Sequence, residues 1–138
     1  MIVVDSNVIA YCWVNGPLTT LAQSVRVKDP EWHVPILWRS EMRSILAGYL
    51  RDGSLTGSQV SEVMRTAERA FERREHIVPS LSVFQIVEKS RLSAYDCEFV
   101  VLALILDVPL VTADKAVLKA FPEMALTMEA FLKTDQSP

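Results

Sequence analysis

The feature that most constrains the fold is an unbroken apolar run, FVVLALIL, at residues 99–106. Eight apolar residues in succession on a helix predict a cylinder that is buried on all sides, unlike a surface helix with one apolar face. Asp96 precedes the run, and Asp107-Val108-Pro109 ends it. The β-rich segment 110–112 that follows is typical of a strand buried in a parallel sheet. We therefore expect a core helix that leads into a central strand.

The rest of the chain alternates short apolar segments with helical patterns. The expected strands are 1–4, 33–35, 77–79, 109–112 and 124–126, and the expected helices, besides the core helix, are 8–13, 19–27, 38–50, 58–74, 83–92, 115–120 and 129–132. Such alternation favours an α/β fold with right-handed crossovers. No repeat or linker divides the chain. The sequence therefore predicts a single domain over residues 1–138, with a mostly parallel central sheet flanked by helices in three layers.

Composition narrows the function classes. The chain has 138 residues, half of them hydrophobic, and a net charge of −3. This acidic balance argues against sequence-blind coating of DNA, which needs a basic face, but it is compatible with a nucleic-acid enzyme that has an acidic centre. The start of the chain predicts a strand rather than a signal peptide, and no apolar run is long enough for a membrane span. Cys12 and Cys97 lie in apolar helical segments, which indicates buried free thiols and a cytoplasmic location.

Carboxylates are the candidate site residues. Asp5 and Asp114 each follow an apolar strand, so in a parallel sheet they lie at the same edge. Glu41 and Asp96 lie at or near helix N-termini, which open toward that edge. Taken singly, each acid has a structural explanation as a helix cap or a first-turn acid, and Asp96 follows Ser93 at capping-box spacing. Taken together, they predict four converging carboxylates.

Such a cluster predicts a bound divalent cation. Crowded carboxylates raise each other's pKa unless a cation lies among them. Mg²⁺ suits oxygen ligands of this kind, and Mn²⁺ accepts the same set. Asn7 and Thr112, two residues from Asp5 and Asp114, are candidates for orienting the acids or a water, although ordinary turn chemistry explains them equally well. His33 and His76 are isolated in the sequence and belong to no metal-binding pattern.

With the acids in place, the chain resembles a PIN domain over nearly its whole length, and specifically a VapC-type toxin ribonuclease of a type II toxin–antitoxin pair. The resemblance rests on V-V-D-S-N at residues 3–7, S-E at 40–41, S-A-Y-D at 93–96 and L-V-T-A-D at 110–114. It implies that Asp5, Glu41, Asp96 and Asp114 are catalytic residues and metal ligands, and that Thr112 is the family's threonine near the last acid.

The resemblance also implies an activity and partners. The implied activity is Mg²⁺- or Mn²⁺-dependent hydrolysis of RNA phosphodiester bonds, with a cognate antitoxin covering the acidic groove and a homodimer as the assembly. A non-catalytic PIN-like interaction module and a PIN nuclease of RNA processing are the alternatives. Trp13, Trp38, Tyr11 and Tyr49 are candidates for an apolar antitoxin dock, with core packing as the more ordinary explanation.

Overall fold

The structure is a computed structural model that describes residues 1–135, and its centre is a parallel five-stranded sheet with the order β3-β2-β1-β4-β5. The strands are β1 (Ile2–Val4), β2 (Trp32–Pro35), β3 (Glu75–His76), β4 (Leu110–Val111) and β5 (Ala125–Leu126). Every pairing between neighbouring strands is parallel. The predicted fold class, a three-layer α/β fold with a parallel sheet, is confirmed.

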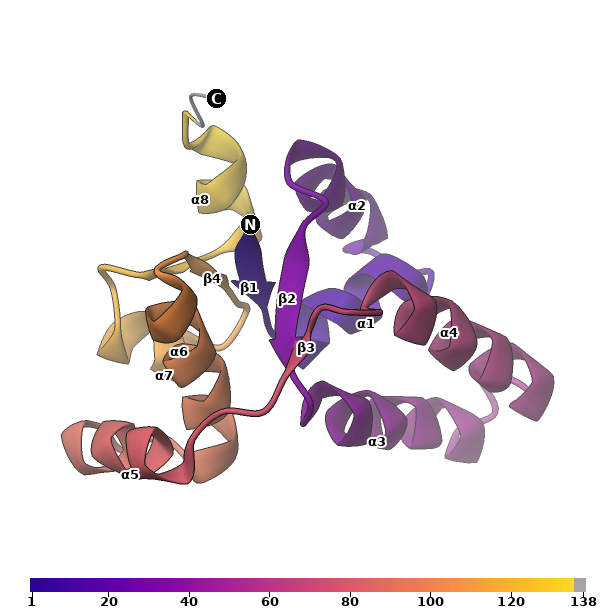
Figure 1. The fold of residues 1–138 in the computed structure, drawn as a ribbon. Helices are drawn as coiled ribbons and strands as arrows, with labels where there is room; N and C mark the ends of the chain where they lie inside the picture. The colour runs from indigo at the N-terminus through magenta and orange to yellow at the C-terminus, as the bar shows by residue number, and fades with distance from the viewer. Residues whose placement is uncertain (136–138) are drawn as a thin grey trace.

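Helices cover both faces of this sheet (Figure 1). They are α1 (Ser6–Trp13), α2 (Thr19–Lys28), α3 (Trp38–Arg51), α4 (Gly57–Ala70), α5 (Ser80–Lys89), α6 (Ala94–Leu106), α7 (Lys115–Ala120) and α8 (Met128–Lys133). Successive strand residues point to opposite faces. Accordingly, Ile2 and Val4 join the apolar cluster beneath α1 to α4, whereas Val3 joins the cluster beneath α5 to α7. Within residues 1–135, none of these helices is long and apolar enough to cross a membrane.

The core helix is α6, but it is not buried on all sides as its composition predicts. Its residues from Phe99 to Ala103 are buried, whereas Leu104 and Ile105 are 50% and 56% exposed. In the last turn Leu106 packs against the core cluster, and the 100° step between helical residues turns the two preceding side chains outward. The helix ends at Asp107 in a left-handed conformation, with φ of 54°. An apolar run alone does not say which of its last residues reach solvent.

The predicted strand at residues 77–79 was wrong. The edge strand β3 lies just before it, at Glu75–His76, and Ile77 is 88% exposed. The cause is the early end of α4, which stops at Ala70 instead of near residue 74, with Arg73 in a left-handed conformation (φ 64°). The chain therefore joins the sheet earlier than the apolar pattern indicates.

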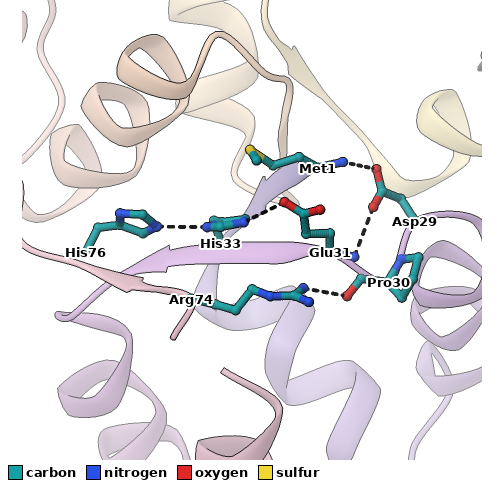
Figure 2. A network of polar contacts seen from close by, with 7 residues as sticks. All are labelled: Met1, Asp29, Pro30, Glu31, His33, Arg74 and His76. Carbon is teal, nitrogen blue, oxygen red and sulfur yellow. Dashed lines mark hydrogen bonds and ion pairs between the residues drawn. The ribbon is translucent and has the colours of Figure 1, made fainter. Parts of the chain in front are cut away.

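Two histidines that are 43 residues apart in the sequence attach β3 to the sheet. Nδ1 of His33, on β2, lies 2.8 Å from Nε2 of His76, on β3, and the His33 Nε2 lies 2.9 Å from a carboxylate oxygen of Glu31. Arg74 donates to the carbonyl of Pro30 at 3.2 Å. Figure 2 shows this network together with the pair formed by the Met1 nitrogen and Asp29. The strand β3 has only two residues and so forms few backbone hydrogen bonds with β2. The side-chain contacts described here therefore help to hold it at the edge of the sheet.

This network predicts a loss of stability in mild acid. Burial and the neighbouring His33 lower the pKa of His76 below its usual value near 6.5. As pH falls through about 6.5 the unfolded chain therefore takes up this proton first, and the stability present at neutral pH declines. Urea unfolding at pH near 7.5 and near 5.5 should show that the wild type loses more stability over this range than His76→Gln does. Equal pH dependence of the two proteins would contradict this account.

Candidate functional site

All four predicted acids line one pocket of about 290 Å³. Its walls are Asp5, Ser6, Asn7, Glu41, Ser44, Ile45, Asp96, Phe99, Leu110, Thr112, Asp114 and Val117. Asp5 follows β1 directly, and Asp114 lies three residues after the last residue of β4. These strands are parallel neighbours at the centre of the sheet, so their carboxyl ends open into the same space. The structure therefore brings the four acids to one pocket, as expected.

Asp5 is the most constrained of the acids. Its Oδ1 accepts a hydrogen bond from the Val8 N–H at 3.0 Å, which makes Asp5 the N-cap of α1. Its Oδ2 accepts from the Thr112 hydroxyl and from the Ala113 N–H, the latter at 3.2 Å. Thr112 is 1% exposed, and its Oγ1 also accepts from the Asp114 N–H at 3.0 Å. One threonine thus fixes the Asp5 side chain and the backbone of Asp114 together.

Glu41 comes from the first turn of α3. Its Oε1 accepts a hydrogen bond from the Ser6 hydroxyl at 2.8 Å, so the start of α1 orients a carboxylate on another helix. Ser6 is 6% exposed. The Ser6 hydroxyl was not among the predicted site residues. The two positions are 35 residues apart, and a serine beside a helix start already has an explanation as capping chemistry.

Asp96 and Asp114 lie at the starts of α6 and α7. Ser93 caps α6 by accepting a hydrogen bond from the Asp96 N–H at 3.1 Å, and the partly buried Asp96 side chain lines the pocket. Asp114 caps α7 itself, because its Oδ1 accepts from the Ala116 N–H at 2.8 Å and from the Val117 N–H at 3.3 Å. Its Oδ2 takes no part in that cap. Asp114 can therefore cap a helix and also contribute a carboxylate oxygen to the pocket, and Asp96 can belong both to the first turn of α6 and to the pocket.

The pocket is electrostatically unfavourable for its own carboxylates. Burial raises the pKa of Asp5, against the hydrogen bonds from Thr112, Val8 and Ala113 that lower it, and the Asp114 charge raises it further. Burial also raises the pKa of Glu41, to which Asp96 and Asp5 add. The pKa of Asp96 is raised by burial and then by Asp114. These groups cost stability when ionised unless a positive charge lies among them.

The donor set fits a hard divalent cation, although the side chains do not form a closed ligand cage. Over residues 1–135, no three His, Cys, Asp or Glu side chains lie close enough together to hold one metal ion as they stand. Mg²⁺, however, keeps several waters and usually binds through one or two carboxylates. Four carboxylates around a pocket of about 290 Å³ leave room for such a hydrated ion. The oxygen-only chemistry of the acids suits Mg²⁺ or Mn²⁺ better than a softer metal.

The structure places the other residues considered at different positions: in the acidic pocket, in the core or at the surface. Asn7 is exposed and lines the pocket, so it is placed to reach a water or a ligand there. Glu98, two residues after Asp96 on α6, lines a different pocket. Trp38 is fully buried and packs 4.8 Å from the Phe71 ring, so it belongs to the core and not to an exposed dock. Trp13 is only partly buried and remains available at the surface.

The sheet order, its helical layers and the acidic pocket at the carboxyl ends of its central strands define a PIN-like α/β fold. The structure is similar to a chain in the crystal structure of FitAcB from Neisseria gonorrhoeae. The TM-score is 0.74, and the match covers 94% of this chain and 99% of that chain, with 15% sequence identity. No family model and no curated protein matches the sequence. At this identity the likeness establishes the fold.

Proposed function

We propose that residues 1–138 form a single PIN-like nuclease domain that hydrolyses RNA phosphodiester bonds with the help of Mg²⁺ or Mn²⁺. The observation that carries the proposal is the single pocket into which four separate elements deliver Asp5, Glu41, Asp96 and Asp114. The raised pKa values of three of these acids support it, because burial and then the neighbouring carboxylates disfavour the ionised forms, and a bound cation would relieve both effects. The PIN-like fold agrees with it.

In this proposal Asp5 and Asp96 hold the cation, and Glu41 and Asp114 hold it directly or through water. A divalent cation lowers the pKa of water and neutralises charge that develops on a phosphate during hydrolysis. The protein's own part is to keep its acids ionised and in place. Ser6 and Thr112 do this by donating hydrogen bonds to Glu41 and Asp5.

The alternative is a non-catalytic interaction module with the same fold. Isothermal titration calorimetry with Mn²⁺ at neutral pH separates the two functions. A nuclease centre predicts a saturable heat of binding that Asp96→Asn abolishes and that Asp107→Asn, an exposed acid at the far end of α6, leaves unchanged. The absence of any binding heat in the folded wild type would favour the module.

We further propose that the nuclease is the toxin of a toxin–antitoxin pair and acts in the cytoplasm. The cognate antitoxin would cover the acidic pocket with a basic side chain, for which these carboxylates are suitable partners. Trp13, Val14, Leu55 and Val63 line a second pocket of about 360 Å³, which offers the antitoxin an apolar contact. A PIN nuclease of RNA processing would share the chemistry and lack this partner. Purification of the tagged chain from its own cells tests the two roles: a co-purifying protein that suppresses RNA cleavage by the chain would support the toxin role, and a chain that purifies alone would favour RNA processing.

Thr112 provides a test of the positioning contacts. Thr112→Val keeps the volume but removes the hydroxyl that joins Asp5 to the Asp114 backbone. We expect RNA cleavage and Mn²⁺ affinity to fall together by about 10- to 100-fold, the usual effect of losing a group that orients a metal ligand. Thr112→Ser, which retains the hydroxyl, should recover most of both. Wild-type cleavage and Mn²⁺ affinity in Thr112→Val would show that the hydroxyl has only a structural part.

A further inference from the structure

The side of α3 that faces the acidic pocket continues beyond the pocket. Ser44, three residues after Glu41, is exposed and lines the pocket. Residues three and four apart are neighbours on a helix, so Gly48 and Arg51 extend this side of α3 to its last residue. We name Ser44, Gly48 and Arg51 the α3 track, which is about 10 Å long. In Figure 1, α3 runs from below the arrowheads of β1 and β2 to the outer edge of the molecule.

Gly48 leaves open space beside the backbone of the helix. A glycine within a helix lowers stability relative to alanine, and it is usually kept for a backbone with positive φ or for close packing. Gly48 is exposed and does not have a positive φ. A β-carbon at this position would meet no atom within 4 Å in the described part of the chain. Contacts among these residues therefore do not require a glycine here, whereas the close approach of a ligand would.

Arg51 places a positive charge at the far end of the track. It is exposed, and none of the ion pairs formed within residues 1–135 involves it. By contrast Arg39, on another side of α3, donates to Glu75 at 2.8 Å and so serves the fold. The acid next to Arg51, Asp52, accepts a hydrogen bond from the Ser54 N–H at 2.8 Å in the loop that follows. Arg51 is therefore accessible to an anion from outside.

We propose that a single strand of RNA leaves the acidic pocket along the α3 track, where Ser44 and Arg51 donate hydrogen bonds to its phosphates and Gly48 lets its backbone pass close to the helix. The inference rests on the proposed function, because it extends the substrate site of the nuclease. Arginine forms strong, charge-assisted hydrogen bonds to phosphate. Contacts to the phosphate backbone position a nucleic acid without reading its sequence. The track therefore holds the strand and does not select the cleavage sequence.

The composition of the track favours RNA over a protein partner. The core of a protein interface is rich in large apolar and aromatic side chains, and none of the three track residues is of this kind. A hydroxyl and a guanidinium are instead donors that suit phosphate oxygens. A pocket of about 290 Å³ has room for a phosphate and its sugar but not for a duplex, and a basic groove that tracks one backbone is how single strands are bound.

Gly48→Gln tests whether the strand passes close to α3. The probe is a fluorescently labelled single-stranded RNA of mixed sequence, and its anisotropy is measured with Ca²⁺ in place of Mn²⁺ so that binding is followed apart from cleavage. Glutamine fills the open space, so the dissociation constant should rise by about 10-fold or more. The thermal midpoint should rise by about 2–4 °C, because glutamine is the better helix former. A structural role of Gly48 alone would not make the protein more stable and weaken its binding of RNA.

Gly57→Gln is the matched control for this substitution. Gly57 is an exposed glycine at the start of α4, where a β-carbon would likewise meet no atom within 4 Å. It lies outside the track. Its variant should bind the RNA with a dissociation constant within about twofold of the wild-type value.

Arg51→Ala tests the contact to phosphate. Loss of one such contact should weaken binding by about fivefold and reduce the slope of log affinity against log salt by about 0.7, the value for one phosphate of a single strand. Arg65→Ala is the control, because Arg65 is an exposed arginine on α4, outside the track. It should leave both quantities unchanged.

Three results would overturn the proposal: a wild type that does not bind the RNA, a Gly48→Gln variant that binds it like the wild type, or an Arg51→Ala variant with unchanged affinity and salt slope. Circular dichroism must show that Gly48→Gln is folded, and if it is not, the exposed Arg51 decides. RNA cleavage is measured separately with Mn²⁺. Weaker binding by both variants without any cleavage by the wild type would support the track and contradict the nuclease. Wild-type binding by both variants together with metal-dependent cleavage would do the reverse.

Discussion

Replacing Asp5 with asparagine is expected to reduce metal-dependent RNA cleavage by about 1000-fold, the effect of losing several kcal/mol of transition-state stabilisation. Asparagine keeps the shape of the side chain and the acceptor for the Val8 N–H, so α1 should still be capped. It removes the negative charge that faces the pocket. The readout is the initial rate of RNA cleavage at saturating Mn²⁺, with circular dichroism to confirm the fold.

Asp107→Asn is the matched control for this substitution. Asp107 is exposed and has φ of 54°, a conformation that asparagine adopts readily, so the change should not affect the fold. Its cleavage rate should equal that of the wild type. If Asp5→Asn retained more than about a tenth of the wild-type rate, a value far above the expected loss, Asp5 would not be a metal ligand in this nuclease.

Trp38→Ala should destabilise the protein by about 3–5 kcal/mol, as large aromatic truncations in cores do. Trp38 is fully buried at the start of α3, where its ring packs against Phe71 and its indole N–H donates to Glu75 at 2.7 Å. Because α3 also carries Glu41, this packing supports the pocket. Urea unfolding followed by circular dichroism measures the loss.

Trp38→Phe separates the packing of Trp38 from its hydrogen bond. Phenylalanine keeps most of the buried ring and removes the N–H, so it should cost about 1–3 kcal/mol, less than alanine. Equal stability of Trp38→Ala and the wild type would contradict the assignment of Trp38 to the core and would favour its role in an antitoxin dock.

The acidic site was predictable because its residues follow from local rules. An acid that follows an apolar strand directly, as Asp5 does, or within a few residues, as Asp114 does, lies at the carboxyl edge of a parallel sheet. Helix-start patterns added Glu41 and Asp96. Convergence of the four acids required only the sheet order. Their roles as metal ligands and catalytic residues remain predictions.

Contacts between distant segments could not be predicted. Nothing in the local sequence joins Ser6 to Glu41, or His33 to His76, because each pair meets only after the strands and helices have packed. The edge strand β3 was misplaced for a related reason: it has two residues, neither of them apolar, and hydrophobicity favoured the neighbouring residues 77–79.

The end of α6 shows the same limit. Hydrophobicity indicates that a side chain avoids water but not whether the protein's own core covers it. Leu104 and Ile105 continue the apolar run and are nevertheless about half exposed. A sequence pattern therefore overestimates the core wherever a helix continues beyond the elements that pack on it.

The most direct test of the central claim is cleavage of a panel of structured and single-stranded RNAs by the purified chain, with Mn²⁺ or Mg²⁺ and with EDTA. We predict cleavage that depends on the metal, that EDTA abolishes, and that yields 5′-phosphate and 3′-hydroxyl ends, because water rather than the ribose 2′-hydroxyl is the nucleophile. Cleavage that persists in EDTA or leaves 2′,3′-cyclic phosphates would contradict a metal-dependent centre built from these four acids.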